Sequence, residues 1–311
     1  MGDVLLFHSG QDSAHVWVDA LKAQMPDLEI RITPDIGDPA DIRYALVWRP
    51  PADFFGQFPN LALIANLGAG VDGLLARTDL PAGIPITRVS DPDMSRMMAS
   101  FVLFAVLRHA RDIPTFERAQ REGRWHYVPP RTADEISVGI LGLGQLGATA
   151  ARELLRQGFK VKGWSRSPKD IEGVECAAGL DALPTFLGGC EILVVMLPLT
   201  GETRHLLDAA RLACLPKGAK LINVARGPIV DEPALVAALQ AGHIAEATLD
   251  VFEKEPLPAE SPLWKMDNVL ITPHLASVAI PKSAAAQIAD NIRRVRAGEP
   301  VEHRVDPSRG Y

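Results

Sequence analysis

The sequence predicts an α/β protein of two domains, and three observations lead to this expectation. Short apolar runs typical of buried strands alternate with helix-forming stretches along most of the chain. One strand–helix–strand unit, within residues 137–167, carries glycines at the spacing G-x-G-x-x-G. The chain has 311 residues, of which 47% are apolar, enough for two hydrophobic cores. We therefore expect parallel sheets with helices on both faces.

The expected elements follow in chain order. The first hundred residues predict a small α/β domain with a helix at 13–25, ending before Pro26, and strands at 4–8, 28–32, 44–48 and 61–66. Residues 94–122 form the longest helical pattern, in which Pro114 marks a kink or break. A second α/β unit begins after Glu135, with helices expected at 148–157 and 280–297 and strands at 138–141, 159–164, 192–197, 220–223, 247–250 and 269–272. The polar tail that follows has no evident role.

The composition disfavours several classes of partner. Lys and Arg number 32 against 38 Asp and Glu, and the net charge of −6 argues against nucleic acid or an anionic membrane. No apolar run reaches the roughly 18 residues of a membrane helix, and the N-terminus has the pattern of a strand rather than a signal peptide. Cys176, Cys190 and Cys214 have no disulfide or metal-site spacing. We expect a soluble, cytoplasmic protein without a metal.

The glycine-rich stretch predicts a dinucleotide-binding loop. Gly142 permits a tight turn, Gly144 lets the backbone approach a pyrophosphate, and Gly147 lets the helix pack closely on the strand. Gln145 and Leu146 complete the loop, and N–H groups at the start of the following helix can receive the phosphate charge. An ordinary glycine turn is the alternative, but the position between a strand and a helix favours cofactor binding.

The residues after the second strand of this unit indicate which cofactor is bound. An NAD site carries an acidic residue that bonds the ribose 2′-hydroxyl. Here Trp164, Ser165, Arg166 and Ser167 stand at that place, and the first carboxylate is Asp170. An Arg between two hydroxyls can bind a 2′-phosphate through charge-assisted bonds. The alternative is a solvated turn, but we expect NADP(H) as the cofactor, with NAD(H) second.

Several motifs, in this order, resemble the D-isomer-specific 2-hydroxyacid dehydrogenase family. They are NLGAGVD at 66–72, GLGQLG at 142–147, LPLTGETRHLL at 197–207, LINVARGPIVDEPALVAAL at 221–239, TLDVFEKEPLP at 248–258 and VLITPHLAS at 269–277. Within the family, WSRS at 164–167 and WRPP at 48–51 are similar to the glyoxylate/hydroxypyruvate reductase A branch.

The resemblance implies an architecture of two Rossmann-like domains. A dinucleotide-binding domain at 97–278 would be inserted into a flavodoxin-like substrate domain formed by 1–96 and 279–311. Two long helices would hinge a cleft whose closure excludes water. Members of the family are usually homodimers, and we carry this over as an expectation. The family's interdomain helix often begins with A-E-x-V-L, whereas Ser100 replaces the Glu here, which affects packing or dimer contacts rather than catalysis.

The resemblance also implies three catalytic residues. His274 would donate a proton to the developing alkoxide, because histidine exchanges protons near neutral pH. Glu255 would accept the other ring N–H and orient the imidazole. Glu253 is the alternative acid, although the E-P-L register favours Glu255. Arg226 would bridge the substrate carboxylate and carbonyl oxygen with its planar guanidinium. A strand-capping histidine and a surface arginine are the structural alternatives.

Further contacts are expected from the same motifs. Residues implied to line the cofactor outside the glycine loop are Leu197, Pro198, Thr203, Ala225 and Asp250, of which Asp250 could instead cap a turn. Substrate contacts are implied for Trp48, for the backbone N–H groups of Ala69 and Gly70, and for Arg226 and His274. A small-residue loop could equally be a plain turn, and a Trp ending a strand is often core.

The predicted function is NADPH-dependent reduction of small 2-oxo acids, glyoxylate to glycolate and hydroxypyruvate to D-glycerate. One alternative is an NAD-dependent D-2-hydroxyacid dehydrogenase for another 2-oxo acid, such as phenylpyruvate or pyruvate. A non-catalytic, dinucleotide-sensing interaction protein is a second alternative. Formate dehydrogenase shares the fold but pairs its His with Gln, so Glu255 argues against it.

Overall fold

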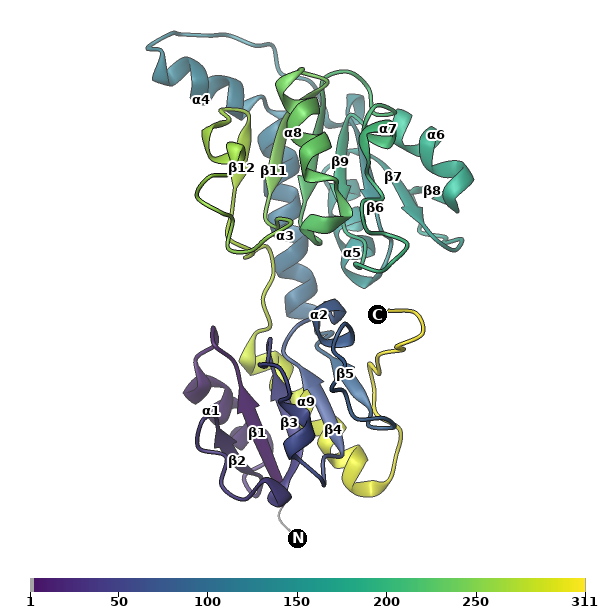
Figure 1. Cartoon of the computed structure of the whole chain (residues 1–311). Helices are drawn as coiled ribbons and strands as arrows, with labels where there is room; N and C mark the ends of the chain where they lie inside the picture. Colours follow the sequence, from purple (N-terminus) through teal and green to yellow (C-terminus); the bar gives the residue numbers. More distant parts are fainter. Residues whose placement is uncertain (1–2, 311) are drawn as a thin grey trace. The chain divides into compact units, whose positions relative to one another are not determined.

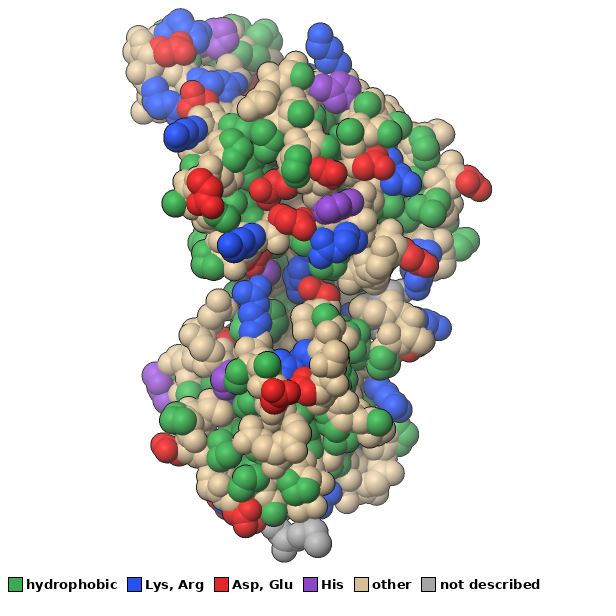
Figure 2. All heavy atoms as spheres, in the orientation of Figure 1, with side chains coloured by type: hydrophobic (Ala, Val, Ile, Leu, Met, Phe, Trp, Pro, Cys, Tyr) green, Lys and Arg blue, Asp and Glu red, His purple; other side chains and the backbone are tan. Residues whose placement is uncertain are grey.

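The computed structural model describes residues 3–310, which form two compact units (Figure 1). The first unit consists of residues up to Met94 together with those from Val278 onward. The second unit is the intervening segment, Ser95–Ser277. Among the described residues, no helix is both long and apolar enough to cross a membrane. Figure 2 shows acidic and basic side chains interspersed over the visible face of each unit.

The first unit is built on a five-stranded parallel sheet with the order β2-β1-β3-β4-β5. Its strands are β1 Val4–His8, β2 Glu29–Ile32, β3 Ile42–Val47, β4 Leu63–Asn66 and β5 Ile86–Arg88, and its helices are α1 Ala14–Gln24, α2 Asp72–Leu75 and α9 Pro281–Ala297. The order 2-1-3-4-5 is that of flavodoxin-like proteins, as predicted. Helix α9 comes from the C-terminal part of the chain and packs on α1, so the core of this unit needs both ends of the chain.

The C-terminal tail covers the edge of this sheet. Thr87 of β5 forms an antiparallel bridge with Arg304, and the Val305 N–H donates to the Ile86 carbonyl at 2.8 Å. The Val305 side chain is buried among the apolar residues of the unit. An exposed edge strand is a template for association with other chains, and the tail occupies part of this edge, a contact that the sequence did not reveal.

The second unit is built on a seven-stranded parallel sheet with the order β12-β11-β10-β9-β6-β7-β8. Its strands are β6 Ser137–Leu141, β7 Lys160–Ser165, β8 Glu175–Ala178, β9 Ile192–Val195, β10 Ala219–Asn223, β11 Ile244–Leu249 and β12 Val269–Ile271. Read from the β8 edge, the order 3-2-1-4-5-6 followed by a seventh strand is that of a dinucleotide-binding fold. The predicted α/β class is confirmed for both units.

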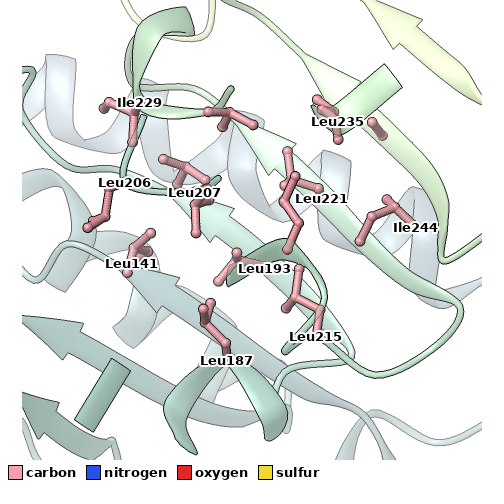
Figure 3. Close-up of a cluster of buried hydrophobic side chains, with 14 of the residues drawn as sticks. Leu141, Leu187, Leu193, Leu206, Leu207, Leu215, Leu221, Ile229, Leu235 and Ile244 are labelled. Atoms are coloured by element: carbon pink, nitrogen blue, oxygen red, sulfur yellow. The ribbon is translucent and has the colours of Figure 1, made fainter. Parts of the chain in front are cut away.

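Helices cover both faces of this sheet (Figure 1). They are α3 Pro92–Ala110, α5 Gln145–Arg156, α6 Leu183–Gly188, α7 Ala209–Leu212 and α8 Glu232–Gln240, whereas α4 Ile113–Arg121 extends away from the sheet. On one face, Leu141, Leu193 and Leu221 of three neighbouring strands meet apolar residues from the helices and loops (Figure 3). Short 3₁₀ helices at Pro39–Asp41, Phe55–Gln57, Ala133–Glu135, Leu180–Ala182, Gly227–Ile229 and Pro262–Lys265 join the elements.

The longest predicted helix is two helices. Asp112 adopts a left-handed conformation with φ of 53°, which ends the pattern begun by α3. Pro114 lies in the first turn of α4, where proline is tolerated because its missing N–H has no partner there. The break was therefore expected at Pro114, whereas it lies two residues earlier, at Asp112. Pro114 belongs to the start of the second helix and does not end the first.

A buried polar network fixes α3 and α4 to β11. His109 of α3 is 2% exposed, with Nδ1 at 3.2 Å from the Glu246 carboxylate and Nε2 at 3.0 Å from the Thr248 hydroxyl. Arg118 of α4 donates to the other Glu246 oxygen at 3.0 Å. Burial lowers the pKa of His109 although Glu246 opposes the shift. For Glu246, burial raises the pKa, but hydrogen bonds from His109 and Arg118 outweigh it and leave the pKa lowered.

We expect His109 to lower the free energy of unfolding in mild acid. Above the ordinary histidine pKa of about 6.5, His109 is uncharged in the folded and the unfolded chain. Below it, the unfolded chain takes up a proton that the folded chain does not, so the free energy of unfolding falls with a slope of up to about 1.4 kcal/mol per pH unit. Urea unfolding of wild type and His109→Gln between neutral pH and mild acid measures the difference in slope.

The exposed His15 of α1 provides the control, since His15→Gln should keep the wild-type slope. His8, whose burial also lowers its pKa, contributes equally to all three proteins. Identical slopes for wild type and His109→Gln would contradict the expectation.

Candidate functional site

The glycine loop joins β6 to α5 by a turn that side chains would obstruct. Gly142 has φ of +121°, and a Cβ there would lie 2.7 Å from the Met196 carbonyl carbon. A Cβ on Gly147 would lie 1.9 Å from the Gly142 oxygen. At Gly144, by contrast, a Cβ would meet nothing within 4 Å. Both crowded glycines thus shape the turn, and Gly144 leaves open space above it.

This open space lies at the start of α5. Gly144 is the residue preceding the helix, and no side chain caps it. The helix begins at Gln145, three residues earlier than expected, so Gln145, Leu146 and Gly147 form its first turn. N–H groups in the first turn have no partner within the helix and carry partial positive charge. The arrangement can bind an anionic group through the backbone.

The turn after β7 presents the side chain of Arg166 to solvent. The Trp164 side chain is 3% exposed and donates from Nε1 to the Gly179 carbonyl at 2.9 Å, so it belongs to the core. The Ser165 hydroxyl donates to the Ser167 carbonyl at 2.7 Å and closes the turn. Arg166 and Ser167 are exposed. The structure therefore places Trp164 and Ser165 as supports of the turn and Arg166 and Ser167 on its surface.

The loop after β9 is closed by a threonine. Leu197 is buried beneath the loop, and Pro198 is exposed. The Thr203 hydroxyl donates to the Pro198 carbonyl at 2.7 Å and accepts from the Thr200 N–H at 2.8 Å. Thr203 thus holds the shape of the loop, which lies at the same sheet edge as the glycine loop because β9 pairs in parallel with β6.

Arg226 follows β10 at this same edge. The buried Asn223 donates from Nδ2 to the Arg226 carbonyl at 3.1 Å and accepts from the Ala225 N–H at 3.1 Å. A Cβ on Gly227 would lie 1.8 Å from the Phe252 carbonyl carbon. The backbone beside Arg226 therefore passes directly against the segment that follows β11. No motif of the sequence pointed to Asn223, although an amide at the end of an apolar strand is a signal of such a role.

Glu255 and His274 meet at the ends of β11 and β12. His274 Nδ1 lies 2.8 Å from the Glu255 carboxylate, and both side chains are half-buried. The second carboxylate oxygen of Glu255 accepts from the Phe252 N–H at 3.2 Å. Glu253, the alternative acid, instead contacts Arg204 at 3.0 Å in an exposed ion pair. In the structure, Glu255 is the acid paired with His274, and Nε2 is the ring nitrogen left for other contacts.

Asp250 holds the segment that carries His274. Its side chain is 1% exposed, and it accepts from the Thr272 hydroxyl at 2.6 Å and from the N–H groups of Leu275 and Ala276 at 2.9 Å. The Asp250 carbonyl accepts from the His274 N–H at 2.9 Å. These bonds fix His274 at φ of 56°, a conformation that costs a non-glycine residue roughly 1–2 kcal/mol. The structure thus gives Asp250 the turn-capping role that the sequence left open.

In the first unit, the loop at 66–70 is fixed by another buried amide. Asn66 donates to the carbonyls of Gly68 and Gly70 at 2.9 and 3.0 Å. A Cβ on Gly68 would lie 2.7 Å from the Trp48 ring, so the indole packs on this loop. The Trp48 N–H donates to Gln11, and the Arg49 guanidinium lies 5.6 Å from the ring centroid. Ala69 and Gly70 are half-buried, and their binding to substrate stays a prediction.

The groups at the edge of the second unit fit a phosphorylated dinucleotide. Gly144 leaves room at the first turn of α5, which no side chain caps, and Arg166 stands in the turn after the neighbouring strand β7. In the part of the chain from 3 to 310, no cluster of three or more His, Cys, Asp or Glu side chains could hold a metal ion.

Comparison with known proteins agrees with this geometry. The profile of the D-isomer specific 2-hydroxyacid dehydrogenases, NAD binding domain, matches residues 103–276. The chain belongs to this family. Among family members, it is 40% identical to the glyoxylate/hydroxypyruvate reductase A of Serratia proteamaculans (strain 568), over 99% of both chains. The family expected from the sequence is thereby confirmed.

Solved structures of family members have the same fold over the whole chain. A D-isomer specific 2-hydroxyacid dehydrogenase from Xanthobacter autotrophicus Py2, in complex with NADPH and MES, is 67% identical with a TM-score of 0.97. An NADPH-dependent glyoxylate/hydroxypyruvate reductase from Sinorhizobium meliloti, in complex with NADP and sulfate, is 35% identical with a TM-score of 0.93. Both similarities cover 100% of each chain.

We expect Asp250→Asn to lower the free energy of unfolding by about 1–3 kcal/mol. The asparagine has one carboxamide oxygen in place of two carboxylate oxygens, so the N–H of either Leu275 or Ala276 would face an NH₂ group and lose its acceptor. Urea unfolding of the purified variant measures the loss. Thr272→Val is the matched control, because it removes only one of the three bonds to the carboxylate and should cost less. An Asp250→Asn protein as stable as wild type would show that these bonds do not hold the turn.

Proposed function

We propose that the protein reduces small 2-oxo acids with NADPH, converting glyoxylate to glycolate and hydroxypyruvate to D-glycerate. The observation that carries this proposal is the 2.8 Å contact between His274 and Glu255 at the sheet edge that also presents Arg226 and the glycine loop. Relatives named for this reaction support it, as does the NADPH or NADP bound by similar solved proteins.

His274 acts as the proton donor. NADPH, when bound, supplies the hydride that the carbonyl carbon receives. The carbonyl π bond then breaks toward oxygen, and the resulting alkoxide takes a proton from Nε2 of the His274 imidazolium. Glu255 accepts the Nδ1 N–H of the ring, which keeps Nε2 directed away from the carboxylate and stabilises the charged imidazolium. Solvent restores the proton to the neutral imidazole after product leaves.

Arg226 binds the acid. Its guanidinium carries a fixed charge and a planar fork of N–H donors, which matches a carboxylate and an adjacent carbonyl oxygen. One donor, Nη1, bonds the Ala225 carbonyl at 2.8 Å, which orients the group. The same charge stabilises the oxygen as it becomes negative.

The cofactor half of the site selects NADPH. The glycine loop and the first turn of α5 hold the pyrophosphate, while Arg166 and Ser167 bind the 2′-phosphate. No carboxylate follows β7 before Asp170, so the turn lacks the acidic residue that an NAD site uses for the ribose 2′-hydroxyl. We assign the dinucleotide domain to 97–278 and the substrate domain to 1–96 and 279–311.

The test follows oxidation of NADPH and NADH by absorbance with glyoxylate, hydroxypyruvate, pyruvate and phenylpyruvate. We expect turnover of the first two acids with NADPH. Arg166→Gln should raise the KM for NADPH about 10- to 100-fold through loss of a charged hydrogen bond, with the KM for NADH nearly unchanged. Arg152→Gln, which removes an exposed arginine from α5, should match wild type.

His274→Gln separates catalysis from cofactor binding in the same assay. It should lower kcat by about 10²- to 10⁴-fold, with NADPH binding retained in a fluorescence titration. Preference for NADH, or turnover with phenylpyruvate alone, would contradict the proposed substrate and cofactor. Tight NADPH binding without turnover of any of the acids would favour a sensing role.

We propose further that the protein works as a homodimer in the cytoplasm. Cys176, Cys190 and Cys214 are free thiols, as expected in a reducing compartment. Helix α4 and the segment after it extend away from the sheet of the second unit (Figure 1). On that segment, Trp125 is 98% exposed and Tyr127 is 75% exposed. Such aromatic anchors are enriched in protein interfaces, and a second copy of the chain is the occupant we propose.

Replacement of the exposed indole should weaken the dimer. We expect wild type to elute as a dimer in size-exclusion chromatography with light scattering, and Trp125→Ser to shift toward monomer at low micromolar concentration. Trp264→Ser is the control, because Trp264 is also exposed, at 52%, but lies in the segment between β11 and β12. A monomeric wild type, or a Trp125→Ser protein that remains fully dimeric, would contradict the proposal.

A further inference from the structure

An ion pair links the loops on either side of the glycine loop. Arg166 Nη1 lies 3.4 Å from the Glu202 carboxylate. Arg166 follows β7 and Glu202 follows β9, and these two strands flank β6 in the sheet. The strands are parallel, so their carboxyl ends, and the glycine loop after β6, share one edge. The pair therefore connects the two neighbours of the strand that leads into the dinucleotide loop.

The backbone beneath Glu202 is ordered. Thr203, its neighbour, donates to Pro198 at 2.7 Å and accepts from the Thr200 N–H. The Arg204 N–H donates to the Thr200 carbonyl at 3.0 Å, which closes a turn around Glu202. On the other side, the bond between Ser165 and Ser167 fixes the turn that carries Arg166. Two ordered turns thus present the carboxylate and the guanidinium to each other.

Both members of the pair are accessible to solvent. The Arg166 side chain is 54% exposed and the Glu202 side chain is 74% exposed. An exposed pair of this kind is weak and is readily exchanged for a stronger partner. A phosphate dianion is such a partner for an arginine, because it offers more charge and a matching geometry.

We propose that Glu202 is a specificity-determining residue that competes with the cofactor's 2′-phosphate for Arg166. The inference rests on the proposed function, in which Arg166 binds that phosphate. A dinucleotide with the 2′-phosphate must share Arg166 with the carboxylate or displace it. A dinucleotide without the phosphate leaves the ion pair intact. Glu202 thus reduces the preference for NADP(H) over NAD(H) below the value that Arg166 alone would give.

Isothermal titration calorimetry with two cofactor fragments tests the proposal without turnover. Adenosine 2′,5′-bisphosphate carries the 2′-phosphate, and 5′-AMP is its counterpart without it. We expect Glu202→Gln to bind the bisphosphate about two- to fivefold more tightly than wild type, the range expected for removal of an exposed competing charge. Binding of 5′-AMP should change less than about twofold.

The control is Glu260→Gln, which removes the same charge from an exposed residue between β11 and β12, at the opposite edge of the sheet from β7. It should leave both affinities unchanged. In an Arg166→Gln background, the effect of Glu202→Gln should shrink to less than about twofold, because the residue for which Glu202 competes is gone.

The outcomes separate this inference from the proposed function. A wild type that binds the bisphosphate no more tightly than 5′-AMP would overturn the assigned role of Arg166 itself. A wild type that does prefer the bisphosphate, with a Glu202→Gln variant of unchanged preference, would overturn only the role of Glu202. Equal tightening of both fragments, or equal tightening in Glu260→Gln, would also overturn it, because the effect would then be one of overall charge.

Discussion

Parallel pairing of the strands is the constraint on which the second unit depends. Every strand in its sheet runs in the same direction, so the carboxyl ends of β6, β7, β9, β10, β11 and β12 lie at one edge. Residues more than a hundred positions apart, such as Gly142 and His274, are thereby brought to that same edge of the sheet. This is the general position of ligand sites in open α/β sheets. The chemistry is then distributed among short connecting segments, each of which contributes one or two groups.

Buried polar side chains convert those connecting segments into fixed structures. Asp250, Asn223 and Asn66 are each at most 5% exposed, and each bonds the backbone of the segment that follows a strand. Since a buried polar group must be hydrogen-bonded to be tolerated, these side chains determine a unique loop conformation. The groups expected to touch ligands are different residues, namely His274, Arg226, Arg166 and backbone N–H groups. The residues that fix the loops are thus different from the residues expected to bind ligands.

Patterns that are local in sequence could be predicted, and patterns that depend on packing could not. The glycine spacing at 142–147 and the strand β1 at Val4–His8 were expected correctly, because a few adjacent residues determine each. The edge strands β5 and β8 were missed, since they are three and four residues long and β8 is only half-buried. Trp164 was expected at the cofactor, yet its indole is buried in the core, because the place of a residue in a motif does not reveal how deeply other segments bury its side chain. The pairing of Glu255 with His274 was expected from motif register alone, whereas the bonds of Asp250 required the three-dimensional turn.

The second unit is inserted into the first, so the first unit is made in two parts during synthesis. Helix α9 supplies Ala284, Ala285, Ile288, Ala289 and Ile292 to the same apolar cluster as β1, β3 and β4, and the tail after it closes the edge at β5. None of these residues has been made when the ribosome completes Ser277. The sheet of the first unit therefore lacks one of its covering helices until the last part of the chain is made. Because domains generally fold as units, we expect the inserted unit to complete its fold before the first unit does.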